Sequence, residues 1–190
     1  MRDLIITENI TIDGVIDTAG DWFAPGGGDD NDQSDVVDVL REQGAASDAL
    51  LLGRVTFEDM RGYWPLQTDD RTGIADYLDN VNKFVVSKTL DEPNWANTSV
   101  LRGPVVEEVQ TLKASPGADI VTTGSMTLTR DLIAADLVDE YRLFVYPVVV
   151  GRGYRLFDNA TDVPGLRLEE ARPFRSGIVL LRYRTTSHRR

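Results

Sequence analysis

Two segments of the chain place an apolar stretch, a glycine and a hydroxyl residue in the same order. They are 50–56, which contains Gly53, and 120–126, which contains Gly124. This order is typical of a strand that runs through glycine into a helix, whose first backbone N–H groups are unpaired and attract anions. Glycine lets a phosphate approach the backbone without meeting a Cβ atom. Two such turns favour a ligand with more than one phosphate, and a dinucleotide is the first candidate.

A third segment, Ser87-Lys88-Thr89, follows another apolar stretch in the same way. All three segments fall at the carboxyl ends of strands that we expect to be parallel, and open α/β sheets bind their ligands at this edge. Basic side chains accompany them, namely Arg54, Lys88 and Arg130. Any one of these turns alone is more often an ordinary connection, but three at one edge favour a site for a small anion.

Proton chemistry in this chain has to come from carboxylates or from bound water. The carboxylates nearest the expected site are Asp13, Asp21, Asp35 and Asp38. A buried carboxyl with a raised pKa could protonate a substrate. The chain has 31 acidic residues, so most of them are expected to be solvated surface groups.

Two further groups of side chains could contact a substrate. Trp22 and Phe23 lie in an otherwise polar stretch, where they either cover a planar ligand or anchor their loop to the core. The segment 151–155 lacks the last glycine of a dinucleotide-binding fingerprint and leads into no long helix, so a bend is the better interpretation. Its Arg152 and Arg155 could still bind an anionic substrate.

The composition excludes several classes of function. A net charge of −11 disfavours binding to nucleic acids and anionic membranes, and no apolar run is long enough to span a bilayer. The absence of cysteine removes thiolate metal sites, and the one histidine, His188, lies in a polar tail, so no metal site is expected. We expect a cytoplasmic protein that binds a small molecule, with residues 1–190 forming one domain.

The hydrophobic pattern predicts the elements that must position these residues. Apolar runs, alternation and helical spacing are interrupted by glycine, proline and capping residues. We expect a three-layer α/β/α fold, with a mostly parallel sheet and antiparallel strands at the C-terminus. The expected strands are 4–12, 48–52, 83–87, 99–101, 119–122, 140–150, 166–174 and 177–184, and the expected helices are 34–44, 55–62, 70–81, one from Pro104, and 125–135.

Four motifs in chain order resemble those of one enzyme superfamily. The segment 11–14, Thr-Ile-Asp-Gly, is similar to the Ser-x-Asp-Gly turn of the riboflavin-pathway pyrimidine reductases. Segment 51–58 resembles the Gly-Arg-x-Thr-[Tyr/Phe]-Glu motif that these enzymes share with dihydrofolate reductases, and 121–125 resembles their x-Gly-Ser turn. Segment 146–157 resembles the Pro-x-x-x-Gly-x-Gly…Phe signature of the riboflavin-type branch.

This resemblance implies a dihydrofolate-reductase-like fold that binds NADPH, in a single reductase domain. It implies that Asp13 lies near the nicotinamide and that the peptide between Thr123 and Gly124 is cis. It also points to a homodimer formed through the C-terminal strands, whose apolar positions would otherwise face water. The implied cofactor residues are Gly53, Arg54 and Thr56 at one helix start, Ser87 and Lys88 beside the 2′-phosphate, and Gly124, Ser125, Met126 and Thr127 around the pyrophosphate.

The predicted function is an NADPH-dependent reductase of a small heterocycle, most like 5-amino-6-(5-phosphoribosylamino)uracil reductase. The catalytic candidates are Asp13, Asp35 or a bound water as proton donor, and the substrate candidates are Trp22, Arg152 and Arg155. A dihydrofolate reductase is one alternative, but no acid aligns cleanly with the pterin-binding carboxylate of that enzyme. The other alternative is an NADPH-binding protein without turnover.

Overall fold

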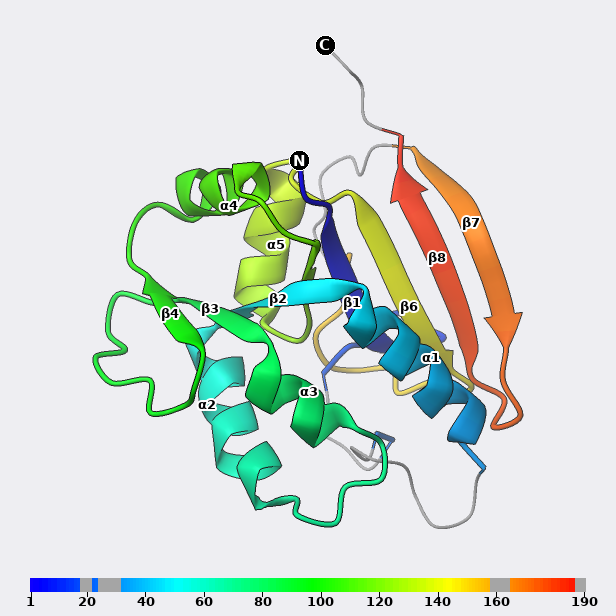
Figure 1. Ribbon diagram of the computed structural model, residues 1–190. Helices are drawn as coiled ribbons and strands as arrows, with labels where there is room; N and C mark the ends of the chain where they lie inside the picture. The colour runs from blue at the N-terminus through cyan, green and yellow to red at the C-terminus, as the bar shows by residue number, and fades with distance from the viewer. Residues whose placement is uncertain (18–21, 24–31, 158–164, 187–190) are drawn as a thin grey trace.

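Eight strands form one mixed sheet in the order β4-β3-β2-β5-β1-β6-β8-β7 (Figure 1). The computed structural model describes residues 1–17, 22–23, 32–157 and 165–186. The strands are β1 (Leu4–Thr11), β2 (Ser47–Gly53), β3 (Asn82–Val86), β4 (Thr98–Leu101), β5 (Asp119–Thr122), β6 (Glu140–Tyr146), β7 (Leu166–Pro173) and β8 (Val179–Thr185). The helices are α1 (Ser34–Ala45), α2 (Arg54–Tyr63), α3 (Ile74–Asn80), α4 (Val105–Ala114) and α5 (Met126–Ala134), and the short 3₁₀ helix η1 (Trp64–Leu66) follows α2.

The direction of the strands divides the sheet into two parts. All neighbours from β4 across to β6 are parallel, whereas β8 runs antiparallel to β6 and β7 runs antiparallel to β8. This arrangement confirms the mostly parallel sheet with antiparallel C-terminal strands. It also brings the carboxyl ends of β1, β2, β3 and β5 to the same edge.

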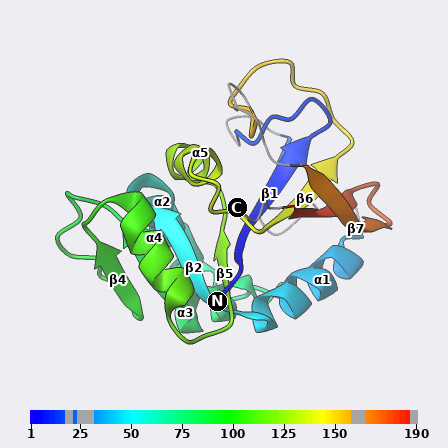
Figure 2. The same ribbon diagram turned by 90° about the horizontal axis from the view of Figure 1, so that it is seen from above.

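Side-chain alternation along the strands explains the three layers. Leu4 and Ile6 of β1 belong to an apolar cluster with residues of α4 and α5, whereas Ile5 packs into a second cluster with Phe57 of α2 and Leu78 of α3. Helix α1 covers the same face as α2 and α3, through Val36 and Val39, over β6 and β8. Figure 2 shows α5 and α1 on opposite sides of the sheet.

Two elements are shorter than their patterns predicted. The helix expected over 70–81 begins only at Ile74, because the Asp70 carboxylate accepts hydrogen bonds from the Thr72 and Ala75 N–H groups (2.8 and 2.9 Å) and forms a turn. The strand expected over 140–150 ends at Tyr146, directly before Pro147, and the chain then folds back. There the Ile12 N–H donates to the Val148 carbonyl at 3.0 Å, so this loop lies beside the end of β1.

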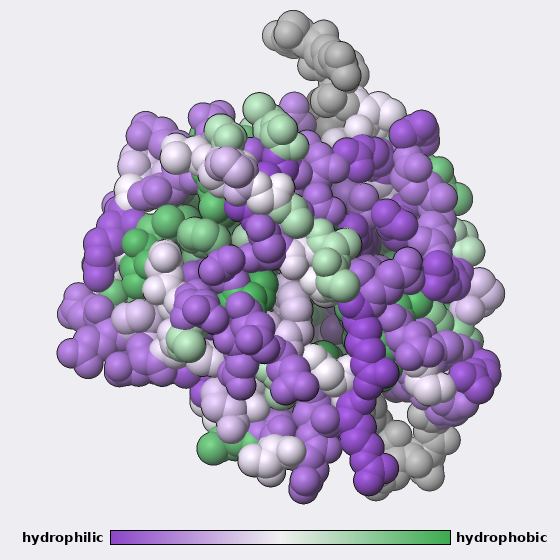
Figure 3. Space-filling model, viewed as in Figure 1, coloured by the Kyte–Doolittle hydropathy of each residue, from purple (hydrophilic) through white to green (hydrophobic). Residues whose placement is uncertain are grey.

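The surface is largely polar on the face seen in Figure 3. Hydrophobic atoms gather there mainly toward β3 and β4, the edge of the parallel part of the sheet. Within the described ranges, none of the helices combines the length and the hydropathy that crossing a bilayer requires.

Candidate functional site

The starts of α2 and α5 lie next to each other at the carboxyl edge of the sheet. Their preceding strands, β2 and β5, are direct neighbours, with Leu51 opposite Thr122. Neither helix has a side-chain hydrogen bond that caps its first turn. Two helix N-termini with unpaired N–H groups and the same sign of partial charge therefore face the same space, which suits a ligand with several negative oxygens.

Direct hydrogen bonds join the two turns into one structure. The Gly53 N–H donates to the Ser125 hydroxyl, and the Ser125 N–H donates to the Thr56 hydroxyl, each at 2.9 Å. Gly124 has φ +61°, and a Cβ atom there would lie 3.1 Å from the Thr56 methyl group, so the turn needs glycine for both conformation and space. The structure thus brings together Gly53, Thr56, Gly124 and Ser125, and α5 begins with Met126 and Thr127.

The expectation of a cis peptide between Thr123 and Gly124 is wrong. No peptide bond in the described part of the chain is cis. The turn is made instead by two successive left-handed residues, Gly124 at φ +61° and Ser125 at φ +41°.

The cationic and hydroxyl side chains near these turns differ in whether another residue already binds them. Arg54 is paired with Glu58 one helical turn later, at 2.7 Å, on an exposed part of α2. Lys88 is exposed, and no described residue is within hydrogen-bond or ion-pair distance of its ammonium group. The Ser87 hydroxyl accepts from the N–H groups of Thr89 and Leu90 (3.2 and 3.0 Å), so it shapes the turn that presents Lys88.

Asp13 holds the end of β1 against the loop that follows β6. Its carboxylate accepts from the Thr11 hydroxyl (2.6 Å) and from the Gly151 N–H (2.8 Å), and Arg155 lies 3.5 Å away. The Thr11 hydroxyl, followed by the Gly151 N–H, lowers the pKa of Asp13 to about 2. An ionised, fully engaged carboxylate is poorly suited to donate a proton at neutral pH, which disfavours the catalytic role that the sequence suggested.

Arg152 and Arg155 occupy different settings in this loop. The Arg155 Nε donates to the Asp13 carbonyl at 3.0 Å, so this guanidinium group is part of the same clamp. Arg152 is exposed, and none of the described residues pairs with it. Of the two arginines predicted to bind a substrate anion, only Arg152 has its full donor set available.

Asp35 lies in the first turn of α1 and is bound to Arg175 in the connection between β7 and β8. It accepts from the Arg175 N–H (3.0 Å) and Nε (3.4 Å), and this N–H is the main cause of the lowered pKa of Asp35. Its geometry is that of a tether between helix and hairpin, and its catalytic role stays a prediction. Asp38 is exposed and near Arg41, and Asp21 lies outside the described residues.

Trp22 and Phe23 pack on Tyr146 at the end of β6. The ring centroids of Trp22 and Phe23 are 5.4 and 5.9 Å from that of Tyr146, both edge to face, and the Trp22 indole N–H donates to the Asp17 carbonyl (2.8 Å). The two side chains are half-buried, so they anchor their segment and still present an apolar surface.

The sheet opens directly beneath the two helix starts, and sequence reasoning missed the residue found there. β1 pairs with β5 only over Leu4–Ile6, whereas its pairing with β6 continues to Thr11. Glu8 lies just beyond the fork and is 5% exposed. Burial raises the pKa of Glu8 well above its usual value. In the sequence it is one acidic residue among many, and only the folded structure shows that it is buried.

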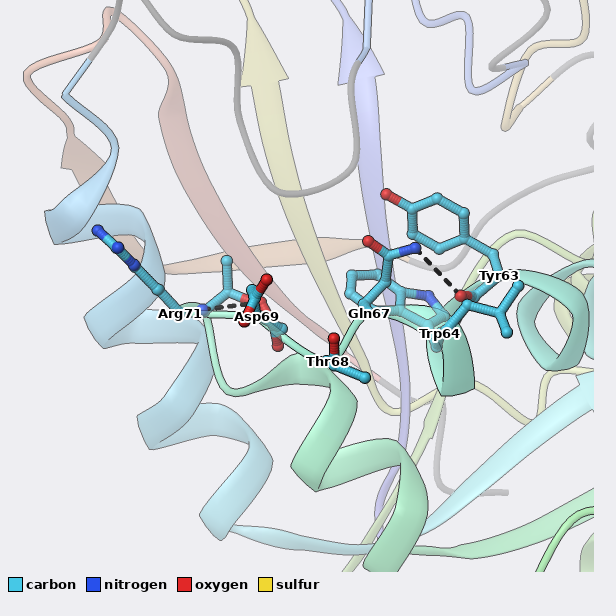
Figure 4. Close-up of a pocket in the computed structure, with 9 residues that line it drawn as sticks. Tyr63, Trp64, Gln67, Thr68, Asp69 and Arg71 are labelled. Atoms are coloured by element: carbon cyan, nitrogen blue, oxygen red, sulfur yellow. Dashed lines mark hydrogen bonds between the residues drawn. The ribbon is translucent and has the colours of Figure 1, made fainter.

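A cavity of about 380 Å³ lies at the opposite end of α2, and no motif indicated it. Figure 4 shows Tyr63, Trp64 and Gln67 on its wall, where the Gln67 amide donates to the Tyr63 carbonyl at 3.3 Å. The rings of Tyr63 and Trp64 meet edge to face, with 5.2 Å between centroids. The cavity thus offers an aromatic wall one helix length, about 15 Å, from the anion turns.

Comparison with known proteins agrees with this geometry. The uncharacterized protein YyaP of Bacillus subtilis is 31% identical over 96% of this chain and 94% of its own length. A putative riboflavin biosynthesis protein of Shewanella has the same fold, at TM-score 0.72 and 17% identity over 97% of this chain and 99% of its own.

Two further solved structures share the fold, each with a TM-score of 0.65 and an alignment that covers 97% of this chain. One is the deaminase/5-amino-6-(5-phosphoribosylamino)uracil reductase of Thermotoga maritima, 16% identical, of which 56% is matched. The other is a dihydrofolate reductase of Enterococcus faecalis complexed with NADP(H), 17% identical, of which 97% is matched. The family model of the RibD C-terminal domain matches residues 2–180. The chain therefore belongs to the RibD C-terminal domain family, with a dihydrofolate-reductase-like fold.

Proposed function

We propose that this protein is an NADPH-dependent reductase of a small phosphorylated heterocycle. The observation that carries the proposal is the pair of uncapped helix starts, joined through Gly53, Thr56 and Ser125 at the carboxyl edge of the sheet. The family and the NADP(H) complex of the dihydrofolate reductase of the same fold support a nicotinamide cofactor.

The donor set of the site fits a dinucleotide with a 2′-phosphate. The first turns of α2 and α5 would hold the pyrophosphate through backbone N–H groups, and Lys88, with Arg54, would hold the 2′-phosphate. NADPH would supply a hydride. The chain itself would orient the cofactor, present the substrate beside it, and exclude water with the aromatic surface of Trp22 and Phe23.

The substrate side favours a phosphorylated pyrimidine over folate. The guanidinium group of Arg152 has no partner among the described residues, and its loop is held by Asp13. Such a group suits a phosphate dianion. A pterin would need a carboxylate free to pair with its ring nitrogens, and Asp35 is instead bound to Arg175. With Asp13 ionised and Asp35 tethered, we propose that a bound water delivers the proton.

The decisive experiment is NADPH oxidation with 5-amino-6-(5-phosphoribosylamino)uracil and, separately, with dihydrofolate. We expect turnover of the pyrimidine and, for Arg152→Ala, a KM for it about tenfold or more above wild type while the NADPH Kd changes little. Turnover of dihydrofolate alone, unaffected by Arg152→Ala, would favour the dihydrofolate reductase alternative. NADPH binding without any turnover would favour the alternative of a binding protein.

Cofactor preference tests the part of the site near β3. Lys88→Ala should raise the Kd for NADPH about 10- to 100-fold, a loss of about 1.5–3 kcal/mol in binding free energy. The Kd for NADH should not change, because only NADPH carries the 2′-phosphate. Titration calorimetry with both cofactors measures this difference. Equal affinities for NADPH and NADH in the wild type would remove Lys88 from the proposal.

We also propose a homodimer that uses the antiparallel end of the sheet. Leu166 and Leu168 are 38% and 52% exposed. They lie in β7, the edge strand, which pairs with another strand on one side only. An apolar edge strand of this kind is normally covered. Light scattering at micromolar concentration should give twice the mass of the chain, and Leu168→Lys should shift that mass toward the monomer.

A further inference from the structure

Glu8 is a buried acid without a full set of partners, directly beneath the start of α5. By strand alternation its side chain is on the same face of β1 as Ile6 and Ile10, which belong to the apolar cluster under α4 and α5. No hydrogen-bond partner among the described residues meets its Oε1 atom. Burying such a group is costly, so its presence in this cluster calls for a physical reason.

Glu8 touches the turn that the proposed cofactor site depends on. The backbone N–H of Gly124 acts on the Glu8 carboxyl group as a hydrogen-bond donor. Gly124 and Ser125 both have left-handed backbone conformations, which persist only where surrounding contacts hold them. The Thr56 hydroxyl binds the Ser125 N–H from the α2 side. Glu8 contacts the same turn from the side of β1, so two different elements hold two successive N–H groups.

We propose that Glu8 is a positioning residue of the anion site, whose buried carboxyl group holds the Gly124–Ser125 turn in place from the side of β1. Its buried setting favours the uncharged form. Burial raises the pKa of Glu8, and this effect outweighs that of the Gly124 N–H, which lowers the pKa. The uncharged form also suits the ligand, because a carboxylate beside the α5 start would repel a phosphate. The inference rests on the proposed function for the identity of that ligand, and not for the contact with Gly124.

Two substitutions at Glu8 separate its possible roles. Glu8→Gln keeps an oxygen acceptor and cannot ionise, whereas Glu8→Leu keeps a similar volume and removes the acceptor. Ser176→Ala is the control, since the Ser176 hydroxyl oxygen is also buried and has no hydrogen-bond partner among the described residues. Ser176 lies in the connection between β7 and β8, away from the two helix starts.

Steady-state kinetics with NADPH distinguish positioning from general support of the fold. We expect Glu8→Leu to raise the KM for NADPH about tenfold while kcat and the substrate KM stay near wild type. Glu8→Gln should restore the KM for NADPH to within about threefold, and Ser176→Ala should behave as wild type. An unchanged KM in Glu8→Leu, or equal damage in Glu8→Gln, would overturn the inference.

Nuclear magnetic resonance tests the contact without any cofactor. The Gly124 amide should exchange with solvent slowly in the wild type and in Glu8→Gln, and at least tenfold faster in Glu8→Leu. The side-chain carboxyl carbon of Glu8 should have the chemical shift of a protonated acid at pH 7. If the wild type fails to bind NADPH, the proposed function fails while these two readouts still judge the inference. If Glu8→Leu does not fold, rapid solvent exchange of the Gly124 amide in the wild type would be enough to overturn it.

Discussion

The two ends of the parallel strands differ in whether their polar groups have partners within the protein. At the amino ends of the strands, charges are paired: Arg2, just before β1, binds Asp48 of β2, and Lys113 of α4 binds Asp139, just before β6. At the carboxyl ends, α2 and α5 begin without side-chain caps, and Lys88 has no partner among the described residues. The paired end stabilises the fold, whereas the open end keeps donors available for a ligand.

Glu140 meets three arginine side chains at the paired end. It is 3% exposed and bonds to Arg142 (2.7 Å) and Arg182 (2.9 Å), with Arg184 3.6 Å away. Burial acts to raise its pKa, but the hydrogen bonds from Arg182 and Arg142 outweigh burial and lower it. A single carboxylate therefore links cations from β6 and β8, where the parallel and antiparallel parts of the sheet meet.

The largest effect is expected at this paired end. Glu140→Ala leaves the buried Arg142 guanidinium without its partner, so the free energy of unfolding should fall by about 3–5 kcal/mol, measured by urea denaturation. The control is Glu169→Ala, which breaks the exposed pair with Arg167 and should cost less than about 1 kcal/mol. The folded fraction of Glu140→Ala should bind NADPH like wild type. A strong loss of affinity would contradict the division of labour between the two ends.

An intermediate effect is expected at the open end. Thr56→Val removes the acceptor of the Ser125 N–H without changing the side-chain volume, so NADPH should bind about tenfold more weakly. Thr111→Val removes a comparable hydroxyl, bonded to the Glu107 carbonyl at 2.8 Å in α4, and should leave the affinity unchanged. Calorimetric Kd values decide the matter, and equal values for both variants would mean that the bridge between the turns has no part in binding.

The smallest effect concerns Asp13 and depends on pH. Its pKa is lowered to about 2 in the folded protein, below that of an unfolded aspartate, about 3.9. The carboxylate therefore contributes stability above about pH 4, and this contribution is lost as the pH falls toward 2. Wild type and Asp13→Asn should differ in unfolding free energy at pH 7 and converge as the pH is lowered below 4. A difference that stays constant down to pH 2.5 would disprove the role of Asp13 as an ionised clamp.

The sequence predicted what depends on local pattern. Alternation and helical spacing identified the strands and helices, and the glycine turns at Gly53 and Gly124 came together as expected because parallel strands end at one edge. Features set by distant contacts could not be predicted in this way. Asp35 is bound by Arg175, far along the chain, and Glu8 is buried beside Gly124, which is also distant in sequence. A carboxylate looks the same in a sequence whether it is solvated, tethered or buried.

The position of β1 has a consequence for how the chain reaches this fold. It precedes the other seven strands of the sheet in the chain, yet it pairs with β5 and β6, so that Leu4 meets Ile120 and Ile5 meets Glu140. Contacts of such large sequence separation slow folding, because a long loop must close before they form. During synthesis β1 has no partner until more than a hundred further residues have followed it. An unpaired apolar strand is prone to aggregation. Thr7, Glu8 and Asn9 interrupt the apolar run of β1 and so reduce this tendency before its partners are made.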